Sequence, residues 1–341
     1  MAKIGLLVAQ LGTPASPTAK DVRTFLREFL SDQRVIDYPR WLWQPILHGI
    51  ILRTRPARSA ALYQRIWRDD GSPLMVYTMR QVDGLRERLG DDFLVLPGMT
   101  YGEPNIETSL KQFEAEGIDR IIVLPMYPQY ASTTTASVID RLNRVIEGNR
   151  QKRTMPALRI VPPYYDDPGY IQSLAKNLAE QVAGWEQDPD HYIFTFHGNP
   201  ERYTRDGDPY KQQCEVTAQL LADALNLPDE KWRLTYQSRF GPEEWLQPYT
   251  DETIEALAEE NIGNLVIYAP GFTADCLETL DELGNEGLEQ WEEAGGHAEN
   301  YFVGACLNDH TFWLDSLASI IRRESQGWVE SAGEVIAHQP V

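Results

Sequence analysis

Cationic side chains are scarce in this sequence. Its 341 residues include 31 Lys and Arg against 51 Asp and Glu, so the formal net charge at pH 7 is -20. A surface of that sign repels the phosphate backbone of nucleic acids. The composition therefore argues against a nucleic-acid partner.

Cysteine is rare as well. Cys214, Cys276 and Cys306 lie far apart and form no CxxC pair. This spacing argues against a zinc ribbon or a disulfide framework, and it suits a reducing compartment. We expect three plain thiols and a cytoplasmic location.

Long hydrophobic runs are absent too. No run approaches the roughly 20 apolar residues that are needed to cross a bilayer. The N-terminal IGLLVA after Lys3 faintly resembles a signal peptide, but it is short and continues into a Gly-Thr-Pro turn. We interpret it as a buried strand, so any membrane contact should be peripheral.

Three common motifs of enzymes are missing. The sequence contains neither GxGxxG after its first apolar run nor GxxxxGK[ST], and it has no GxSxG elbow. A dinucleotide or nucleoside triphosphate would lack its usual phosphate cradle, and the commonest hydrolase architecture is excluded. We expect no organic cofactor.

Short apolar runs alternate with longer amphipathic stretches. This alternation is typical of strands buried in a parallel sheet and connected by helices, and it predicts an α/β fold. The predicted strands are Ile4 to Leu11, Phe93 to Pro97, Ile121 to Pro125, Tyr192 to Phe196, Arg233 to Gln237 and Leu265 to Ala269.

The two halves of the chain resemble each other. LGTP at residues 11–14 is echoed by HGNP at residues 197–200, directly after the first predicted strand of each half. We therefore predict two similar domains, residues 1–150 and 151–330, which share a cleft.

The first half contains an insertion, at about residues 15–75, which we call the lip. It carries an apolar segment with a basic edge, made of Trp41, Trp43, Ile46, Leu47, Ile50, Ile51 and Leu52 followed by Arg53, Arg55 and Arg58. Such a segment could cover a flat apolar ligand with carboxylates, or it could be a helix that packs on the core. The pattern alone leaves both interpretations open.

His197 ends the predicted strand YIFTF and precedes Gly198. Ligands of doubly wound sheets bind beyond the carboxyl ends of the strands, so this imidazole should face the cleft. Imidazole ordinarily titrates near neutral pH and suits proton transfer. A purely structural histidine is the alternative.

A row of carboxylates follows the last predicted strand. Glu278, Glu282 and Glu286 are four residues apart, on one face of a helix that Asp275 could cap. A solvated acidic face is the plain interpretation in so acidic a chain. The position next to a strand end favours a site that attracts a cation.

The sequence resembles the sequences of ferrochelatases over nearly its whole length. The matching motifs, in order, are LGTP, VRTFLREFLSDQRVIDYPR, GSPL, YGEPN, PMYPQYASTT, FHGNPERY, GDPY, TYQSRFGPEEWLQPYTDE, PGFTADCLETLDELGNEG and CLND. The resemblance implies two Rossmann-like domains that hold a porphyrin between them under the lip. It also implies insertion of Fe2+ into protoporphyrin IX or coproporphyrin III with release of two protons, in the terminal part of haem biosynthesis.

Several functional residues of the family are similar to residues at matching positions of this sequence. The resemblance implies that His197 and Glu278 are catalytic and that Glu282 and Glu286 join them in handling the metal. It places the porphyrin against Leu11, Arg53, Arg55, Tyr63, Ser72, Tyr101, Tyr127, Trp245 and Phe272. The long apolar lip favours protoporphyrin, and it could also touch a membrane peripherally.

Three positions depart from the family's pattern: Gln10, Thr100 and Asn199.

Some relatives carry an iron–sulfur cluster on four cysteines. Because this sequence has only three cysteines, we expect no cluster. Two alternatives remain: a chelatase for cobalt or another tetrapyrrole, and a tetrapyrrole-binding protein without catalysis.

Overall fold

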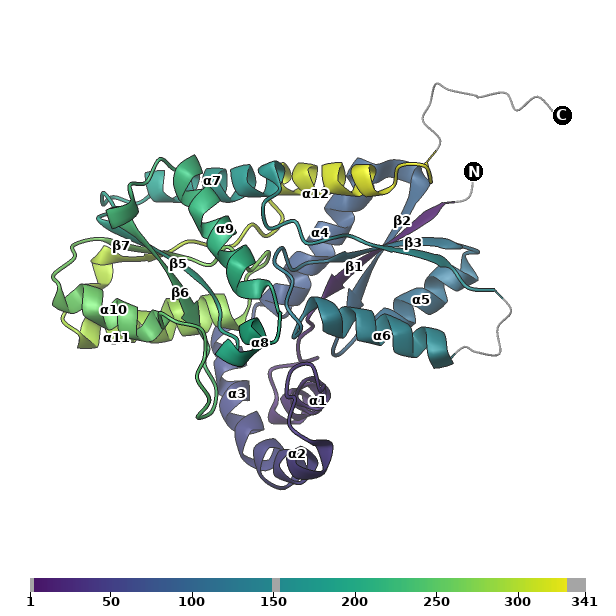
Figure 1. Ribbon diagram of the computed structural model, residues 1–341, viewed down its shortest axis with the longest axis horizontal. Coiled ribbons are helices and arrows are strands. Elements are labelled where there is room, and N and C mark those ends of the chain that lie inside the picture. The colour runs from purple at the N-terminus through teal and green to yellow at the C-terminus, as the bar shows by residue number, and fades with distance from the viewer. Residues whose placement is uncertain (1–2, 149–153, 330–341) are drawn as a thin grey trace.

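Two parallel four-stranded sheets form the framework of the molecule (Figure 1). The computed structural model describes residues 3–148 and 154–329. The first sheet has the strand order β2-β1-β3-β4 and the second β6-β5-β7-β8. The strands are β1 (Ile4–Gln10), β2 (Phe93–Met99), β3 (Arg120–Pro125), β4 (Ala157–Ile160), β5 (His191–His197), β6 (Trp232–Gln237), β7 (Leu265–Tyr268) and β8 (Tyr301–Val303).

The shared strand order confirms the predicted α/β fold with two similar halves. All six predicted strands form, and the central strand β1 is buried along its entire length, as a continuous apolar run in a parallel sheet should be. The predicted domain boundary at residue 150 falls in 149–153, outside the described residues. The strand β4 follows it and pairs with β3, so the first sheet extends past that boundary.

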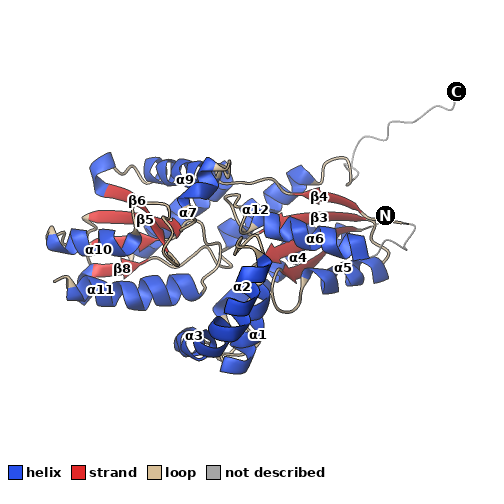
Figure 2. Ribbon diagram, turned by 60° about the horizontal axis from the view of Figure 1, so that its bottom comes forward, coloured by secondary structure: helices blue, strands red, loops and turns tan. Residues whose placement is uncertain are grey.

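Helices cover both faces of each sheet (Figure 2). On the first sheet α5 and α6 pack on one face and α4 on the other; on the second, α10 and α11 oppose α7 and α9. These helices are α4 (Pro73–Leu89), α5 (Ile106–Ala115), α6 (Thr135–Gly148), α7 (Pro168–Ala183), α9 (Tyr210–Ala224), α10 (Thr250–Glu259) and α11 (Gly287–Glu293). Short 3-10 turns are η2 (Gly90–Asp92), η3 (Asp229–Lys231) and η5 (Ala298–Asn300).

The last helix, α12 (Thr311–Glu324), joins the two halves. It packs against α4 of the first half and α7 of the second. A Cβ at Gly84 would lie 2.5 Å from a methyl carbon of Leu314, so glycine allows α4 and α12 to pack this closely. One hydrophobic core therefore runs from the first sheet through α12 into the second.

The lip projects from this framework as a group of helices, at the bottom of Figure 1. Its elements are α1 (Ala19–Leu30), α2 (Arg40–Ile46), the π-helix η1 (Leu47–Ile51) and α3 (Leu52–Ile66). Trp43 and Leu47 are buried in a core of the lip's own, whereas Trp41 is 78% exposed and Ile50 58%. One face of the apolar segment therefore packs on a core, and the role of the exposed face as a ligand cover stays a prediction.

Candidate active site

A pocket of about 850 Å³ lies between the two sheets and the lip. The carboxyl ends of β1, β3, β5 and β6 reach its wall, as expected for ligand sites of doubly wound sheets. At the first of these ends, Gly12 has φ +104° and a Cβ there would lie 1.8 Å from the carbonyl oxygen of Tyr101. Glycine is thus required for the turn that leads from β1 into the lip.

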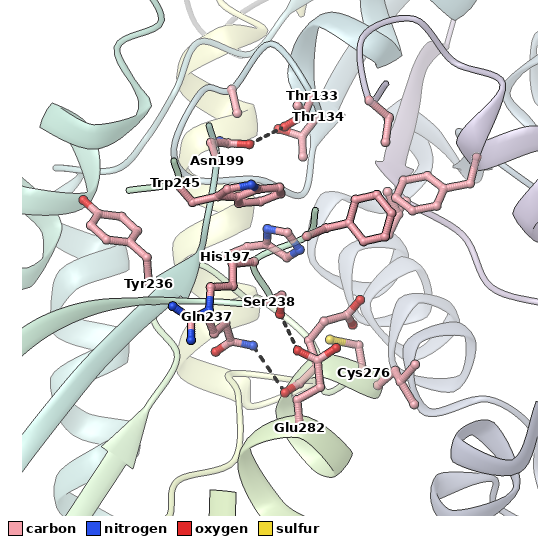
Figure 3. A pocket seen from close by; sticks show the side chains of 18 of the residues that line it. Thr133, Thr134, His197, Asn199, Tyr236, Gln237, Ser238, Trp245, Cys276 and Glu282 are labelled. Carbon is pink, nitrogen blue, oxygen red and sulfur yellow. Dashed lines mark hydrogen bonds between the residues drawn. The ribbon is translucent and has the colours of Figure 1, made fainter. Parts of the chain in front are cut away.

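His197 is the last residue of β5 and lines the pocket, half-buried (Figure 3). Its Nδ1 lies 2.7 Å from the carbonyl oxygen of Gly198. A carbonyl only accepts hydrogen bonds, so Nδ1 carries the proton and Nε2 of the neutral ring keeps its lone pair. The indole of Trp245 lies beside the imidazole, with the ring centroids 6.5 Å apart. His197 can therefore accept a proton at Nε2.

The acidic row also lines the pocket. Glu278, Glu282 and Glu286 all lie on η4 (Glu278–Glu286), which is a π-helix rather than the α-helix that the spacing predicted. Its i→i+5 bonds widen each turn, and side chains four residues apart still share a face. π-Helical turns are rare and are frequent at functional sites.

The environment of Glu282 and of Glu286 disfavours their ionised forms. Burial, followed by the charge of Glu278, raises the pKa of Glu282 to about 8. A hydrogen bond donated by the Ser238 hydroxyl opposes this rise (Figure 3). Burial and Asp281 also raise the pKa of Glu286, against the opposing charge of Arg65. At neutral pH Glu282 is therefore largely protonated.

The lip holds the π-helix in place. Arg65 of α3 forms an ion pair with Asp281, with 3.0 Å between Nε and Oδ1, and the Asp281 side chain is 0% exposed. The amide of Asn285 donates to the same oxygen at 2.7 Å. The acidic row and the lip are thus linked through one buried carboxylate.

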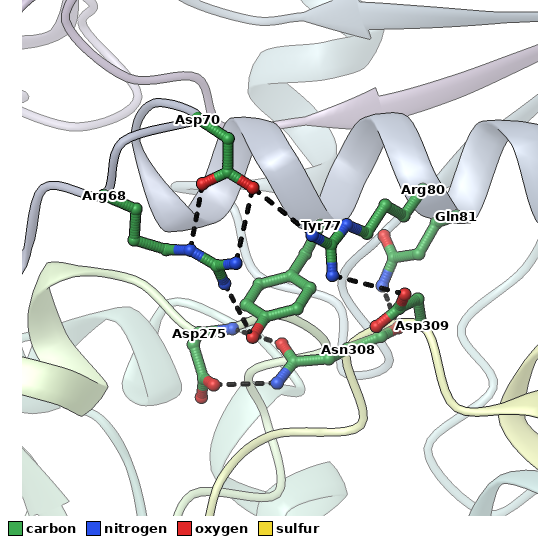
Figure 4. A network of polar contacts seen from close by, with 8 residues as sticks. All are labelled: Arg68, Asp70, Tyr77, Arg80, Gln81, Asp275, Asn308 and Asp309. Atoms are coloured by element: carbon green, nitrogen blue, oxygen red, sulfur yellow. Dashed lines mark hydrogen bonds and ion pairs between the residues drawn. The ribbon is translucent and has the colours of Figure 1, made fainter.

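The loop before η4 is fixed from the other side (Figure 4). Asp275 does not cap a helix, which corrects the prediction; its carboxylate accepts from the Cys306 amide at 2.9 Å and from Asn308 Nδ2 at 2.7 Å. Gln81 of α4 is fully buried, and its Nε2 donates to the carbonyl oxygens of Thr273 and Asn308, at 3.1 and 2.8 Å. The first domain therefore positions the loop that leads to Glu278.

Seven of the nine predicted porphyrin contacts line the pocket: Leu11, Arg55, Tyr63, Ser72, Tyr127, Trp245 and Phe272. Ser72 accepts a hydrogen bond of 2.8 Å from the hydroxyl of Thr13. Burial, followed by the charge of Glu278, raises the pKa of Tyr63 well above its ordinary value. This phenol therefore stays neutral beside the acidic row.

The other two predicted contacts do not line the pocket. Tyr101 is 0% exposed, and its hydroxyl donates to Asp32 at 2.9 Å, behind the pocket wall. Arg53 is exposed on α3, two residues before Arg55, and two helical positions put the side chains on different faces. Neither residue lines the pocket in this arrangement, and their contact with a porphyrin stays a prediction.

The three departures from the family's pattern fall at or near the wall. Gln10 and Asn199 line the pocket, where Gln10 accepts the Leu11 amide at 3.0 Å and Asn199 accepts the Thr133 hydroxyl at 3.4 Å. Thr100 is buried outside the lining. The two amides therefore contribute polar groups, with part of their hydrogen-bonding capacity used inside the protein.

The predicted metal residues are not gathered into one coordination sphere. In the described part of the chain, no three His, Cys, Asp or Glu side chains lie close enough to hold an ion together. His197, Glu278, Glu282 and Glu286 are instead distributed along the pocket wall. Cys276 also lines the pocket, and burial raises the pKa of its thiol well above the ordinary value.

Several residues that shape the site were not predicted from the sequence. Ser238, with φ +63°, reaches Glu282, while Arg65 and Gln81 hold the acidic segment. Ser238 lies in the quoted motif TYQSRFG, which was a signal that it matters. Nothing in the sequence indicated the partners of Arg65 and Gln81.

Comparison of the sequence with known proteins identifies its family. A model of the ferrochelatase family matches residues 3–325. The chain belongs to the ferrochelatase family. The ferrochelatase of Vibrio cholerae is 47% identical over 322 residues, which are 94% of this chain and 98% of that protein. The ferrochelatase of Brucella anthropi is 45% identical over 331 residues, 96% and 93% of the two chains. The protein is thus a metal chelatase of haem biosynthesis.

Solved structures resemble the fold at lower identity. SirB from Bacillus subtilis with Fe3+ superposes with a TM-score of 0.55 at 13% identity, covering 95% of this chain and 96% of that one. The sirohydrochlorin chelatase SirB from Bacillus subtilis subspecies spizizenii in complex with cobalt gives 0.54 at 9%, covering 94% and 95%. At these identities the likeness concerns the fold.

Among the described residues, no helix combines the length and apolarity that a membrane span needs.

Proposed function

We propose that the protein inserts Fe2+ into a porphyrin that carries propionates, protoporphyrin IX or coproporphyrin III. The observation that carries this proposal is that the free Nε2 of His197 and the acidic row line one pocket. A free-base porphyrin must lose two N–H protons as the dication enters, so an acceptor for protons and a route for the metal are both needed. The reaction requires neither an organic cofactor nor an iron–sulfur cluster.

His197 takes one pyrrole proton at Nε2 and releases it to solvent before it takes the second, because the neutral ring has a single free lone pair. The ring becomes an imidazolium that keeps its Nδ1–H bond to the Gly198 carbonyl, so the imidazole does not need to turn. Glu278 accepts or relays protons on the acidic side. Glu282 is largely protonated at neutral pH, so it relays protons better than it binds the incoming cation.

Few potential metal ligands lie close together among the described residues, and this suits turnover. Fe2+ that is held by few ligands can leave them for the four nitrogens of the porphyrin, whereas a closed ligand set would retain it. Glu278 and Glu286 lie on either side of Glu282 in the row and can lead the ion along the pocket wall.

Arg55 binds the propionates. It lines the pocket from the lip, its guanidinium lies 5.4 Å from the Phe240 ring centroid, and it has no ion pair among the described residues. A guanidinium is well suited to a carboxylate. Leu11, Trp245 and Phe272 then pack on the apolar macrocycle.

We also propose a cytoplasmic enzyme whose lip touches the membrane peripherally. Trp41, Leu42 and Ile50 are exposed on the lip, beside Arg40 and Arg53. Exposed apolar side chains with adjacent cations favour an anionic phospholipid surface. Sedimentation with vesicles of anionic lipid tests this, and Trp41→Ser with Ile50→Ser should reduce the bound fraction without reducing insertion in solution.

Anaerobic absorbance spectroscopy of the purified protein tests the reaction. Fe2+ is supplied in parallel with protoporphyrin IX and with coproporphyrin III. Conversion of either free-base spectrum to that of the iron porphyrin is the expected result. Binding of both porphyrins without insertion of iron, or insertion of Co2+ alone, would overturn the proposal.

A further inference from the structure

Among the residues that the structure describes, three arginines line the pocket: Arg55, Arg202 and Arg239. They differ in the ion pairs that their guanidinium groups form within the protein. Arg202, in α8 (Glu201–Arg205), directs both Nη atoms at the carboxylate of Asp37 and its Nε at Glu243. This is a complete two-sided pairing of one guanidinium by two carboxylates.

Arg239 is neutralised in the same way. Its Nη2 lies 2.9 Å from Asp251 and its Nη1 2.8 Å from Glu252, and the group stacks over the Tyr249 ring at 4.2 Å. Each of the two pocket-lining arginines of the second domain therefore belongs to a cluster of one cation and two anions. Arg55 of the lip is the lining arginine without an ion pair in the described chain.

This distribution gives the pocket an uneven charge. A substrate carboxylate can bind Arg55 directly. To bind Arg202, a substrate carboxylate must first displace Asp37 or Glu243. It then lies beside the carboxylate that remains, in a cluster whose net charge is already negative. Asp37, Glu243 and Arg202 all line the pocket, so a substrate that fills it meets this cluster.

We propose that Asp37 and Glu243 are specificity-determining residues that select porphyrins with two carboxylates over porphyrins with four. They act by occupying Arg202, which otherwise offers a second carboxylate site. The proposal rests on the proposed function, since it concerns which porphyrin the same pocket accepts. Selection against a wrong substrate by an unfavourable charge is a common device.

Binding without iron tests the selection separately from the chemistry. Fluorescence quenching gives the Kd of protoporphyrin IX, with two carboxylates, and of coproporphyrin III, with four. In D37N/E243Q the ratio of affinities should shift at least tenfold towards coproporphyrin III, relative to the unmodified protein. An unchanged ratio would overturn the proposal.

The triple variant D37N/E243Q/R202M identifies the cause. If Arg202 is the uncovered carboxylate site, the gain for coproporphyrin III is lost again in this variant. If the gain persists, the lip has merely loosened or negative charge has merely been removed, and the role of Arg202 is refuted. Because these readouts need no turnover, a wild-type protein that binds porphyrin without inserting iron would refute the proposed function alone.

Discussion

Arg65 of the lip helix α3 forms an ion pair with Asp281, a carboxylate that is completely buried in the π-helix η4. The contact joins the part of the protein that covers the pocket to the part that carries Glu278, Glu282 and Glu286. The other oxygen of Asp281, Oδ2, has no hydrogen-bond partner among the described residues. The buried charge thus depends strongly on Arg65 and on the amide of Asn285.

Replacing Arg65 by Met should lower the free energy of unfolding by about 2–3 kcal/mol, because it leaves a buried carboxylate without its cation. Urea denaturation measures the loss. The double variant R65M/D281N should recover a large part of it, since no uncompensated charge remains. Equal losses in the single and double variants would show that the ion pair itself contributes little.

The raised pKa of Glu282 predicts a pH-dependent stability. The native state holds this proton up to about pH 8, whereas the unfolded chain releases it near the ordinary value of 4.5. The unfolded state therefore binds fewer protons in this interval, and the contribution of Glu282 to stability falls as pH rises from 4.5 to 8. Thermal unfolding of Glu282→Gln at pH 5, 7 and 9 should show a gain over wild type that grows with pH.

The matched control for this experiment is Glu292→Gln, at an exposed position of α11. Its stability difference from wild type should stay nearly constant over the same pH range. A Glu282→Gln difference that is equally flat would contradict the assigned burial of that carboxyl group.

Arg55 and Arg53 provide a matched pair on one helix. Arg55→Met removes the unpaired guanidinium in the pocket, so the Kd for protoporphyrin IX should rise about tenfold, as expected for one charged hydrogen-bonded contact. Arg53→Met removes an exposed arginine outside the lining and should change the Kd by less than twofold. Fluorescence quenching measures both, and equal effects would refute the propionate site at Arg55.

Gln81 tests the positioning of Glu278 from the first domain. Gln81→Met preserves volume but leaves the carbonyl oxygen of Asn308 without its donor and the carbonyl oxygen of Thr273 with only the Asn308 amide. We expect a loss of stability of about 1–3 kcal/mol and a lower kcat with little change in KM, because the loop before η4 can shift. An unchanged kcat in folded protein would show that the other contacts of the loop, among them those of Asp275 and Thr273, fix it without Gln81.

The strands could be predicted from the sequence where burial is complete. β1, β3 and β7 are continuous apolar runs, and such runs have few alternatives to a buried parallel strand. β4 and β8 were missed because they are short, with half-exposed residues and no long apolar run. Their pairing depends on the neighbouring strand rather than on their own pattern.

The site could be predicted only in part, for a similar reason. A motif identifies a position, but whether Tyr101 faces the pocket or the core behind it depends on packing, and here Asp32 draws its hydroxyl inward. The spacing of the glutamates fits an α-helix and a π-helix equally well. The pairing of Arg202 with Asp37 spans 165 residues, and no local pattern predicts it.

We propose that His197 accepts the porphyrin's pyrrole protons, and His197→Ala tests this role most directly. Anaerobic assays should show Fe2+ insertion at least about a hundredfold slower than in wild type, the scale expected for loss of a positioned base, with the Kd for protoporphyrin IX changed less than about threefold. His297→Ala, at an exposed histidine outside the pocket, should insert iron at the wild-type rate. Wild-type insertion by His197→Ala would contradict the account.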